Sequence, residues 1–149
     1  MGYNLYIGEA TVSECLEERR AWVDVEAVDG ESLDAPLNST DNHSNCIYPG
    51  YSAWAEFCRN AGLTEVFFAG SAPCPHGVWW KGESGKDYEG LLARHPGCEA
   101  LTDDHRKAFV AAKERYKGED EYSKKRLDWL VWWTDWALKN CKYPSFFNS

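Results

Sequence analysis

The sequence lacks any apolar run that approaches the roughly 20 residues of a membrane-spanning helix. Its start, MGYNLYIGEA, lacks the basic and apolar regions of a signal peptide. Tyr6 also occupies the position at which the myristoylation pattern requires Ser or Thr. We therefore expect a cytoplasmic protein that is not attached to a membrane.

Basic residues are also scarce. The 149-residue chain has 16 Lys and Arg against 24 Asp and Glu, which gives a net charge of −8. Because a nucleic-acid polymer or an anionic membrane is bound by clustered Lys and Arg, we expect neither as a partner. Two interpretations of the acidity stay open. The charge keeps the chain in solution by repulsion, or it forms an acidic face that occupies a basic groove of a host enzyme.

The common catalytic motifs are missing as well. The chain has no Gly-x-Ser-x-Gly elbow, no His-Glu-x-x-His pair and no dinucleotide fingerprint. The run Asp103-Asp104-His105 carries acid–base groups, but adjacent acids at the start of a helix commonly complement its dipole. The sequence therefore favours a binding protein over an enzyme.

Six cysteines are present, and without an export signal we expect reduced thiols. Cys74, His76, His95 and Cys98 form a Cys-x-His…His-x-x-Cys arrangement whose side chains could hold a tetrahedral zinc ion. This spacing is not one of the common zinc patterns, so we expect no cofactor and keep zinc as the alternative. The same side chains could also pair as nucleophile and base in a small hydrolase.

Two strands are predicted near the start of the chain. Residues 3–8 and 19–28 alternate apolar and polar side chains, so they could pair as a hairpin across the segment 11–18. The apolar run EVFFAG at 65–70 is interpreted as a further short strand, with an extension of the preceding helix as the alternative. The chain length fits a single domain over 1–149.

Three helices are predicted from apolar spacing and from residues that favour helix ends. They run from Ser52 to Gly62, from Thr102 to about Tyr116, and from about Asp120 to Cys141. The last two form an antiparallel helical hairpin. Residues 29–50 and 70–100 are long irregular segments. The fold class is therefore α+β, in which a small antiparallel sheet packs with about three helices.

The last predicted helix has two apolar faces. The aliphatic face comprises Leu127, Leu130, Val131, Thr134, Leu138 and Cys141. The opposite face, here named the tryptophan face, comprises Trp129, Trp132, Trp133 and Trp136. The polar edge comprises Lys124, Asp128, Asp135 and Lys139, whose four-residue spacings suit salt bridges along the helix.

A helix that is apolar on both faces must be covered on both faces. Three covers for the tryptophan face stay open. The first is the segment 70–100, with Val78, Leu91 and Leu92 folded over the rings. The second is another subunit or a partner protein, because Trp is enriched at interface hot spots. The third is a ligand.

The segment 73–98 has the composition of a ligand-binding loop. Its aromatic and cationic residues are Trp79, Trp80, Lys81, Lys86, Arg94 and His95. Aromatic rings stack on a base, and glycine-rich turns with cations bind phosphate. KGESGK is not a Walker A motif, and a solvated turn anchored by two tryptophans is the alternative.

Three stretches carry a resemblance to a known group of proteins, namely YPGYSAWAEFC, HPGCEALT and LDWLVWWTDWALKNCKYPSFFNS. They resemble segments of small accessory proteins of tailed bacteriophages, a group with no established activity. The resemblance covers less than half of the chain and implies a protein made in the bacterial cytoplasm that acts on host pathways.

The leading hypothesis is an oligomeric binding protein that sequesters a small aromatic, phosphorylated ligand such as a nucleotide second messenger and thereby counters host defence. The alternatives are a protein inhibitor of a host enzyme, acting through its tryptophan-rich or acidic surface, and a small metal- or Cys/His-dependent hydrolase.

Overall fold

The computed structural model describes residues 2–15, 20–38, 41–68, 91–92 and 99–148. It has an α+β fold, in agreement with the predicted class. The helices are α1 (Tyr51–Ala61), α2 (Thr64–Phe67), α3 (Asp103–Arg115) and α4 (Glu121–Asn140), with a short 3₁₀ turn η1 (Glu31–Leu33). The strands are β1 (Leu5–Cys15), β2 (Arg20–Val25), β3 (Cys46–Ile47), β4 (Leu91–Leu92), β5 (Glu99–Ala100) and β6 (Pro144–Asn148).

The sheet is organised around β1, which is long enough to pair with three neighbours. Its order is β4-β2-β1-β6-β5, and β3 also pairs with β1. The outer part of β1 pairs antiparallel with β2, from Ala10 opposite Val25 to Cys15 opposite Arg20. Its inner part pairs antiparallel with β6, from Leu5 opposite Asn148 onwards. The predicted hairpin is confirmed, although β1 extends through Cys15 into a segment that was predicted to connect the two strands.

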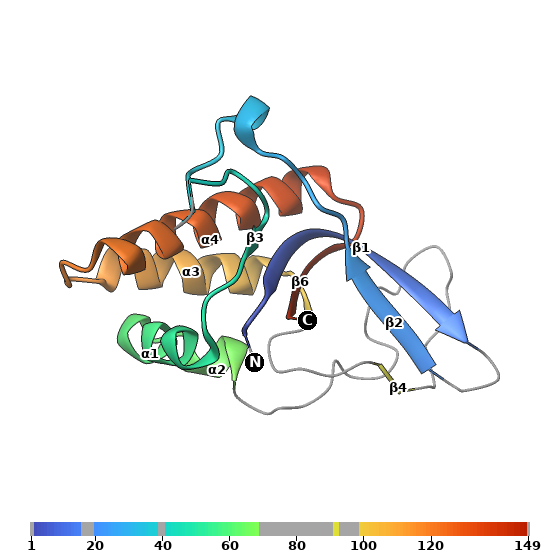
Figure 1. The fold of residues 1–149 in the computed structure, drawn as a ribbon, viewed down its shortest axis with the longest axis horizontal. Coiled ribbons are helices and arrows are strands. Elements are labelled where there is room, and N and C mark those ends of the chain that lie inside the picture. Colours follow the sequence, from blue (N-terminus) through green and yellow to red (C-terminus); the bar gives the residue numbers. More distant parts are fainter. Residues whose placement is uncertain (1, 16–19, 39–40, 69–90, 93–98, 149) are drawn as a thin grey trace.

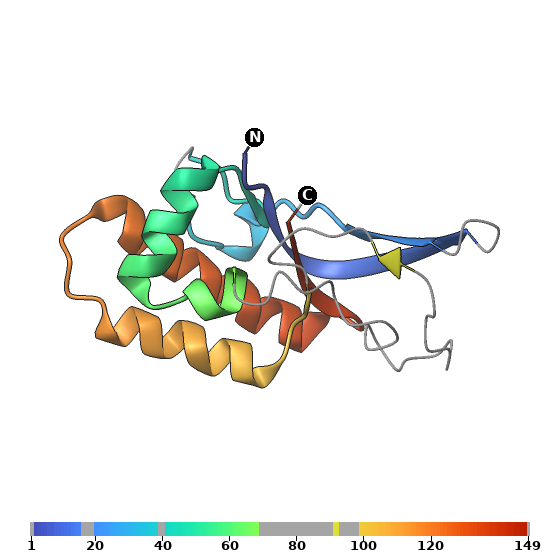
Figure 2. The ribbon, with the colours of Figure 1, turned by 90° about the horizontal axis from the view of Figure 1, so that it is seen from below.

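The helices gather around the inner part of the sheet (Figure 1). α3 and α4 lie side by side, while α1 and α2 lie near the start of β1 (Figures 1 and 2). The outer part of the β1–β2 hairpin projects away from the helices (Figure 2). The core therefore lies between the helices and the inner halves of β1 and β6, where Leu5, Ile7 and Phe146 are fully buried.

The predicted helical hairpin is confirmed in α3 and α4. Thr102 caps α3, and Asp120 caps α4 by accepting from the backbone of Tyr122. The predicted salt bridges along α4 are wrong, because both aspartates of its polar edge pair with α3. Asp128 lies 2.9 Å from the Lys113 ammonium, and Asp135 pairs with Arg106. Because α3 lies antiparallel beside α4, Lys113 and Arg106 lie opposite the two carboxylates.

Two local predictions on the N-terminal side of the core are corrected. α1 is capped by the extended Gly50 instead of Ser52, while Gly62, with φ 72°, ends the helix as expected. Residues 64–67 form the helix α2 and not a strand. One helical turn keeps Leu63 and Phe67 close together, so both side chains point into the same part of the core. An extended strand would place Phe67 farther from Leu63 and out of that part of the core.

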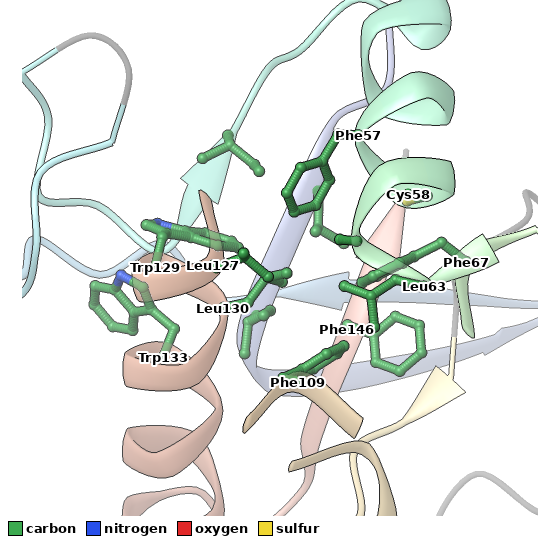
Figure 3. Close-up of a cluster of buried hydrophobic side chains, with 14 of the residues drawn as sticks. Phe57, Cys58, Leu63, Phe67, Phe109, Leu127, Trp129, Leu130, Trp133 and Phe146 are labelled. Carbon is green, nitrogen blue, oxygen red and sulfur yellow. The ribbon is translucent and has the colours of Figure 1, made fainter. Parts of the chain in front are cut away.

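Aromatic rings fill much of the core. Tyr3 stacks on Trp54 with ring centroids 5.5 Å apart, and Phe67 stacks on Phe109 at 5.7 Å. Phe67 also meets Phe146 of β6 edge-on at 5.5 Å. Figure 3 shows Phe67, Phe109 and Phe146 close together in the core, near Leu127 and Leu130 of α4. The density of large aromatics therefore has a structural cause, since such rings bury more area than any other side chains.

Candidate functional site

The tryptophan face of α4 is divided between the core and the surface. Trp129 and Trp133 are 0% exposed, and Trp132 and Trp136 are half-buried. Leu127 and other members of the aliphatic face are also buried, so the prediction of a helix covered on both faces is confirmed. Only Trp132 and Trp136 keep ring surface that a ligand or partner could reach.

The first irregular segment covers the buried tryptophans. The indole Nε1 of Trp129 donates to the backbone carbonyl of Ser44 at 3.0 Å. Gly30 packs against the ring of Trp133, and a Cβ on Gly30 would lie 2.7 Å from its Cζ2. Figure 3 shows the two buried tryptophans, Trp129 and Trp133, turned toward this part of the chain. Of the residues expected to cover the rings, Val78 lies outside the described residues, and Leu91 and Leu92 form β4, which pairs with β2.

Asn45 holds this segment against the sheet. Its side-chain amide is fully buried and donates to the carbonyls of Ile7, at 2.9 Å, and Glu26, at 2.7 Å. Its Oδ1 accepts from the backbone N–H of Val28 at 2.8 Å. One side chain therefore satisfies three backbone groups, one on β1 and two just after β2. These bonds hold the chain that follows β2 in place.

Residues 24–41, which run from the end of β2 to just before Asn45, are here named the acidic segment. Its acids are Asp24, Glu26, Asp29, Glu31, Asp34 and Asp41, and all six are exposed. The sequence has no Lys or Arg between Arg20 and Arg59. Within the described residues, none of the six carboxylates forms an ion pair. The segment thus presents uncompensated negative charge.

Apolar side chains and a cleft accompany this charge. Leu33 and Leu37 are 41% and 39% exposed. η1 stands out from the rest of the ribbon at the top of Figure 1. An open cleft of about 460 Å³ lies beside it and is lined by residues 27–29, Glu31 and residues 41–44. The acidic segment therefore combines exposed apolar side chains, negative charge and a cleft on one part of the surface.

A second, smaller pocket lies between α1 and the first turns of α4. Its volume is about 280 Å³, and it is lined by Ala53, Glu56, Phe57, Asn60, Asp120, Tyr122, Ser123 and Arg126. No motif in the sequence indicated this site, because its residues come from two helices that are far apart in the chain.

Arg126 is the most unusual group in this pocket. It is half-buried, and its Cζ lies 5.7 Å from the centroid of the Phe57 ring. Burial lowers the pKa of the guanidinium, while the negative charge of Asp120 acts in the opposite direction. Among the described residues, no acceptor lies within hydrogen-bond or ion-pair distance of Arg126. The thiol of Cys58 supplies no counter-charge, because burial raises its pKa to about 12.

The remaining predicted site residues lie outside the part of the chain that the structure describes. The expected ligand residues, which are Trp79, Trp80, Lys81, Lys86, Arg94 and His95, lie outside the described residues. So do the zinc candidates Cys74, His76 and Cys98. In the part of the chain that the structure describes, no group of three or more His, Cys, Asp or Glu side chains is arranged to hold a metal ion.

The acid–base run at the start of α3 has a structural role. The backbone N–H of Thr102 donates to His105 Nδ1 at 3.0 Å, and the His105 N–H donates back to Thr102 Oγ1 at 3.4 Å. This is a capping box with His105 at its third position. Asp103 pairs with Lys107 one turn later. These contacts agree with the interpretation that Asp103-Asp104-His105 stabilises the start of a helix.

Comparisons with known protein families, with curated proteins and with solved structures gave no match to this chain. None of the helices in the described ranges combines the length and the apolar character that crossing a membrane requires. What the site does must therefore be argued from the site itself, because an α+β fold alone does not imply a function.

Proposed function

We propose that this protein is a binding protein that docks a basic surface of a partner protein on its acidic segment. The observation that carries the proposal is the set of six exposed carboxylates without an ion-pair partner in the described chain. The resemblance to phage accessory proteins suggests the setting. In the bacterial cytoplasm, such a protein would inhibit a host enzyme by occupying a groove that normally receives an anionic substrate.

The two kinds of side chain on the segment have different tasks in this proposal. The carboxylates attract a basic surface over a distance and raise the association rate, an effect that salt screens. Leu33 and Leu37 supply the apolar area that carries affinity once water is excluded. Asn45 and Trp129 support the proposal because they hold the acidic segment in place before binding. Binding then costs little entropy for ordering this segment.

The test compares two neutralised variants in a pull-down from host lysate, followed by binding kinetics with the captured protein. The triple variant Asp29→Asn, Glu31→Gln, Asp34→Asn removes charge from the acidic segment. The control Asp104→Asn, Glu114→Gln, Glu119→Gln removes the same charge from other exposed positions. We expect the first variant to lose its partner and the control to retain it, with an association rate that falls as salt rises. Equal retention by both variants would overturn the proposal.

Sequestration of a small aromatic, phosphorylated ligand is the second candidate. It is supported by the two half-buried tryptophans, which flank the buried Trp133 with ring centroids 4.8 Å and 5.2 Å away. In this proposal Trp132 and Trp136 form the floor of a site that the predicted loop residues complete. A nucleotide panel in a thermal-shift assay tests it, since a ligand that binds only the folded state raises the melting temperature.

The same tryptophan surface could instead form a contact between subunits of a homo-oligomer. Native mass spectrometry of the purified protein separates these outcomes, because it reports subunit number and retained ligand in one spectrum. A nucleotide retained by a monomer supports the ligand site. A dimer that dissociates in the Trp132→Ala, Trp136→Ala variant supports the subunit contact and removes the reason for a ligand at these rings.

A further inference from the structure

We propose that the pocket between α1 and α4 binds a small zwitterion, a molecule that carries one carboxylate and one ammonium group, as a free α-amino acid does. The pocket uses none of the residues of the acidic segment, so this inference is independent of the docking function proposed above. Its basis is the combination of an unpartnered half-buried cation, an unpartnered acid and aromatic walls in one cavity of suitable size.

The guanidinium of Arg126 is the expected carboxylate site. A half-buried cation without an ion pair loses hydration that its contact with Phe57 restores only in part. The planar guanidinium presents donors in a fork that matches the two oxygens of a carboxylate. A carboxylate brought by a ligand would therefore satisfy donors that the described residues leave open.

The acids of the pocket decide which anion fits. Glu56 and Asp120 line the same cavity, so the three charged groups together carry a net charge of −1. A dianion such as phosphate would be repelled by two nearby carboxylates, whereas a ligand with its own positive charge would not. Asp120 is engaged, because it accepts from the hydroxyl of Ser123 at 2.8 Å. Glu56 is exposed and without a partner among the described residues, so it is the expected ammonium site.

The size and walls of the pocket limit the ligand further. Its volume of about 280 Å³ lies just below the range of roughly 300–1,000 Å³ for small-molecule sites. That space suits one amino-acid-sized molecule. Phe57 and Tyr122 place rings on the lining, and Asn60 adds an amide that can donate and accept. An amino acid with an apolar or aromatic side chain matches these walls.

The first experiment titrates three related probes into the ¹⁵N-labelled full chain and follows amide shifts by NMR. L-phenylalanine carries both charges, L-phenylalaninamide carries only the ammonium, and N-acetyl-L-phenylalanine carries only the carboxylate. We expect saturable shifts at α1 and at the start of α4 with L-phenylalanine, and at least about tenfold weaker binding of the other two, because each lacks one charge-assisted contact. Inorganic phosphate is expected to cause no saturable shift.

Variants then assign the two contacts. Arg126→Met keeps the apolar stem and removes the cation, so binding of L-phenylalanine should be lost. The control Lys125→Met removes the same charge at the adjacent exposed position. This control should bind L-phenylalanine as the wild type does. Glu56→Gln, an exposed substitution that leaves the core untouched, should remove the preference for L-phenylalanine over its N-acetyl derivative. Glu65→Gln on α2 is its control and should retain that preference.

Several outcomes would overturn the inference. Absence of saturable shifts with L-phenylalanine, or shifts that map elsewhere, removes the site. Equal affinity for N-acetyl-L-phenylalanine or for phosphate shows a simple anion site instead of a zwitterion site. If Arg126→Met fails to fold, Glu56→Gln still decides the matter, because an unchanged preference in that variant contradicts the assigned ammonium contact.

Discussion

The indole Nε1 of Trp129 donates a hydrogen bond to the carbonyl oxygen of Ser44 at 3.0 Å, across 85 residues of sequence. This bond joins the centre of the longest helix to the segment that leads into β3. It satisfies the polar atom of a fully buried indole, which would otherwise cost free energy. Together with the hydrogen bonds of Asn45 and the contact of Gly30 with Trp133, this bond holds the chain around the acidic segment against the core.

Replacement of Trp129 by phenylalanine tests this connection. The variant loses the hydrogen bond, leaves the Ser44 carbonyl unsatisfied and opens space in the core, so we expect a loss of about 2–5 kcal/mol in the free energy of unfolding. Amide hydrogen exchange in residues 28–45 should accelerate more than exchange in α3. The half-buried Trp132→Phe serves as the control and should change both quantities less. Unchanged exchange in residues 28–45 would show that other contacts hold the segment.

Gly30 should not tolerate any side chain. A Cβ at this position would lie 2.4 Å from the His43 carbonyl oxygen and 2.7 Å from the ring of Trp133, and neither atom belongs to the far end of a flexible chain. We expect Gly30→Ala to destabilise the fold by about 1–3 kcal/mol through overpacking. In Gly2→Ala the nearest atom is 3.4 Å away, an ordinary contact, so stability should be nearly unchanged. Denaturant titration of both variants measures the difference.

Asn45→Ala should be among the most damaging substitutions of a single polar residue. It removes three hydrogen bonds at once and leaves the carbonyls of Ile7 and Glu26 without that donor. At about 1 kcal/mol for each bond, with a further penalty for buried orphaned groups, we expect a loss of about 3–5 kcal/mol in chemical denaturation. Asn60→Ala at an exposed position of α1 should leave stability near the wild-type value. A small effect of Asn45→Ala would mean that water or rearrangement replaces these bonds.

The thiol of Cys58 should make stability depend on alkaline pH. Burial raises its pKa from about 9 to about 12 in the folded state, so the thiol stays neutral there while the unfolded chain deprotonates. Its contribution to stability is therefore complete below pH 9 and declines as the pH rises from about 9 toward 12. By linkage the slope approaches about 1.4 kcal/mol for each pH unit.

Comparison with Cys58→Ala isolates this effect from the titration of Lys and Tyr, because those groups are common to both proteins. The difference in unfolding free energy between the wild type and the variant should shrink as the pH rises from 9 to 10.5. The folded protein should also resist thiol-specific reagents at Cys58 until it unfolds. A difference that stays constant with pH would contradict the raised pKa.

Local sequence patterns predicted the helices well, but not what lies on them. The two faces of α4 could be derived because 20 consecutive helical residues repeat the apolar spacing several times. The cover of the tryptophan face could not be derived, since the contact of Trp129 with Ser44 depends on tertiary packing and has no local signal. The strand prediction for the run at 65–70 is wrong where that run overlaps α2, because a short apolar run fits a strand and a helix equally well.

The strand β6 and the residue Arg126 were missed for related reasons. β6 has only five residues, and its identity as a strand depends on β1, whose Leu5 pairs with Asn148. Arg126 looks in the sequence like any other charge on a helix with many charges. Its significance comes from Phe57 on α1, which lies against it, and from the lack of an acceptor among the described residues.

The pairing of β1 with β6 also has a consequence for synthesis of the protein. The residues of β6 are made long after those of β1, so the edge of β1 that pairs with β6 remains unpaired until the residues up to Asn148 have been made. This part of β1 carries Leu5 and Ile7, which are fully buried in the finished fold. Until β6 has been made, the nascent chain therefore has an unpaired strand edge, and such an edge is a place where another chain can pair with it.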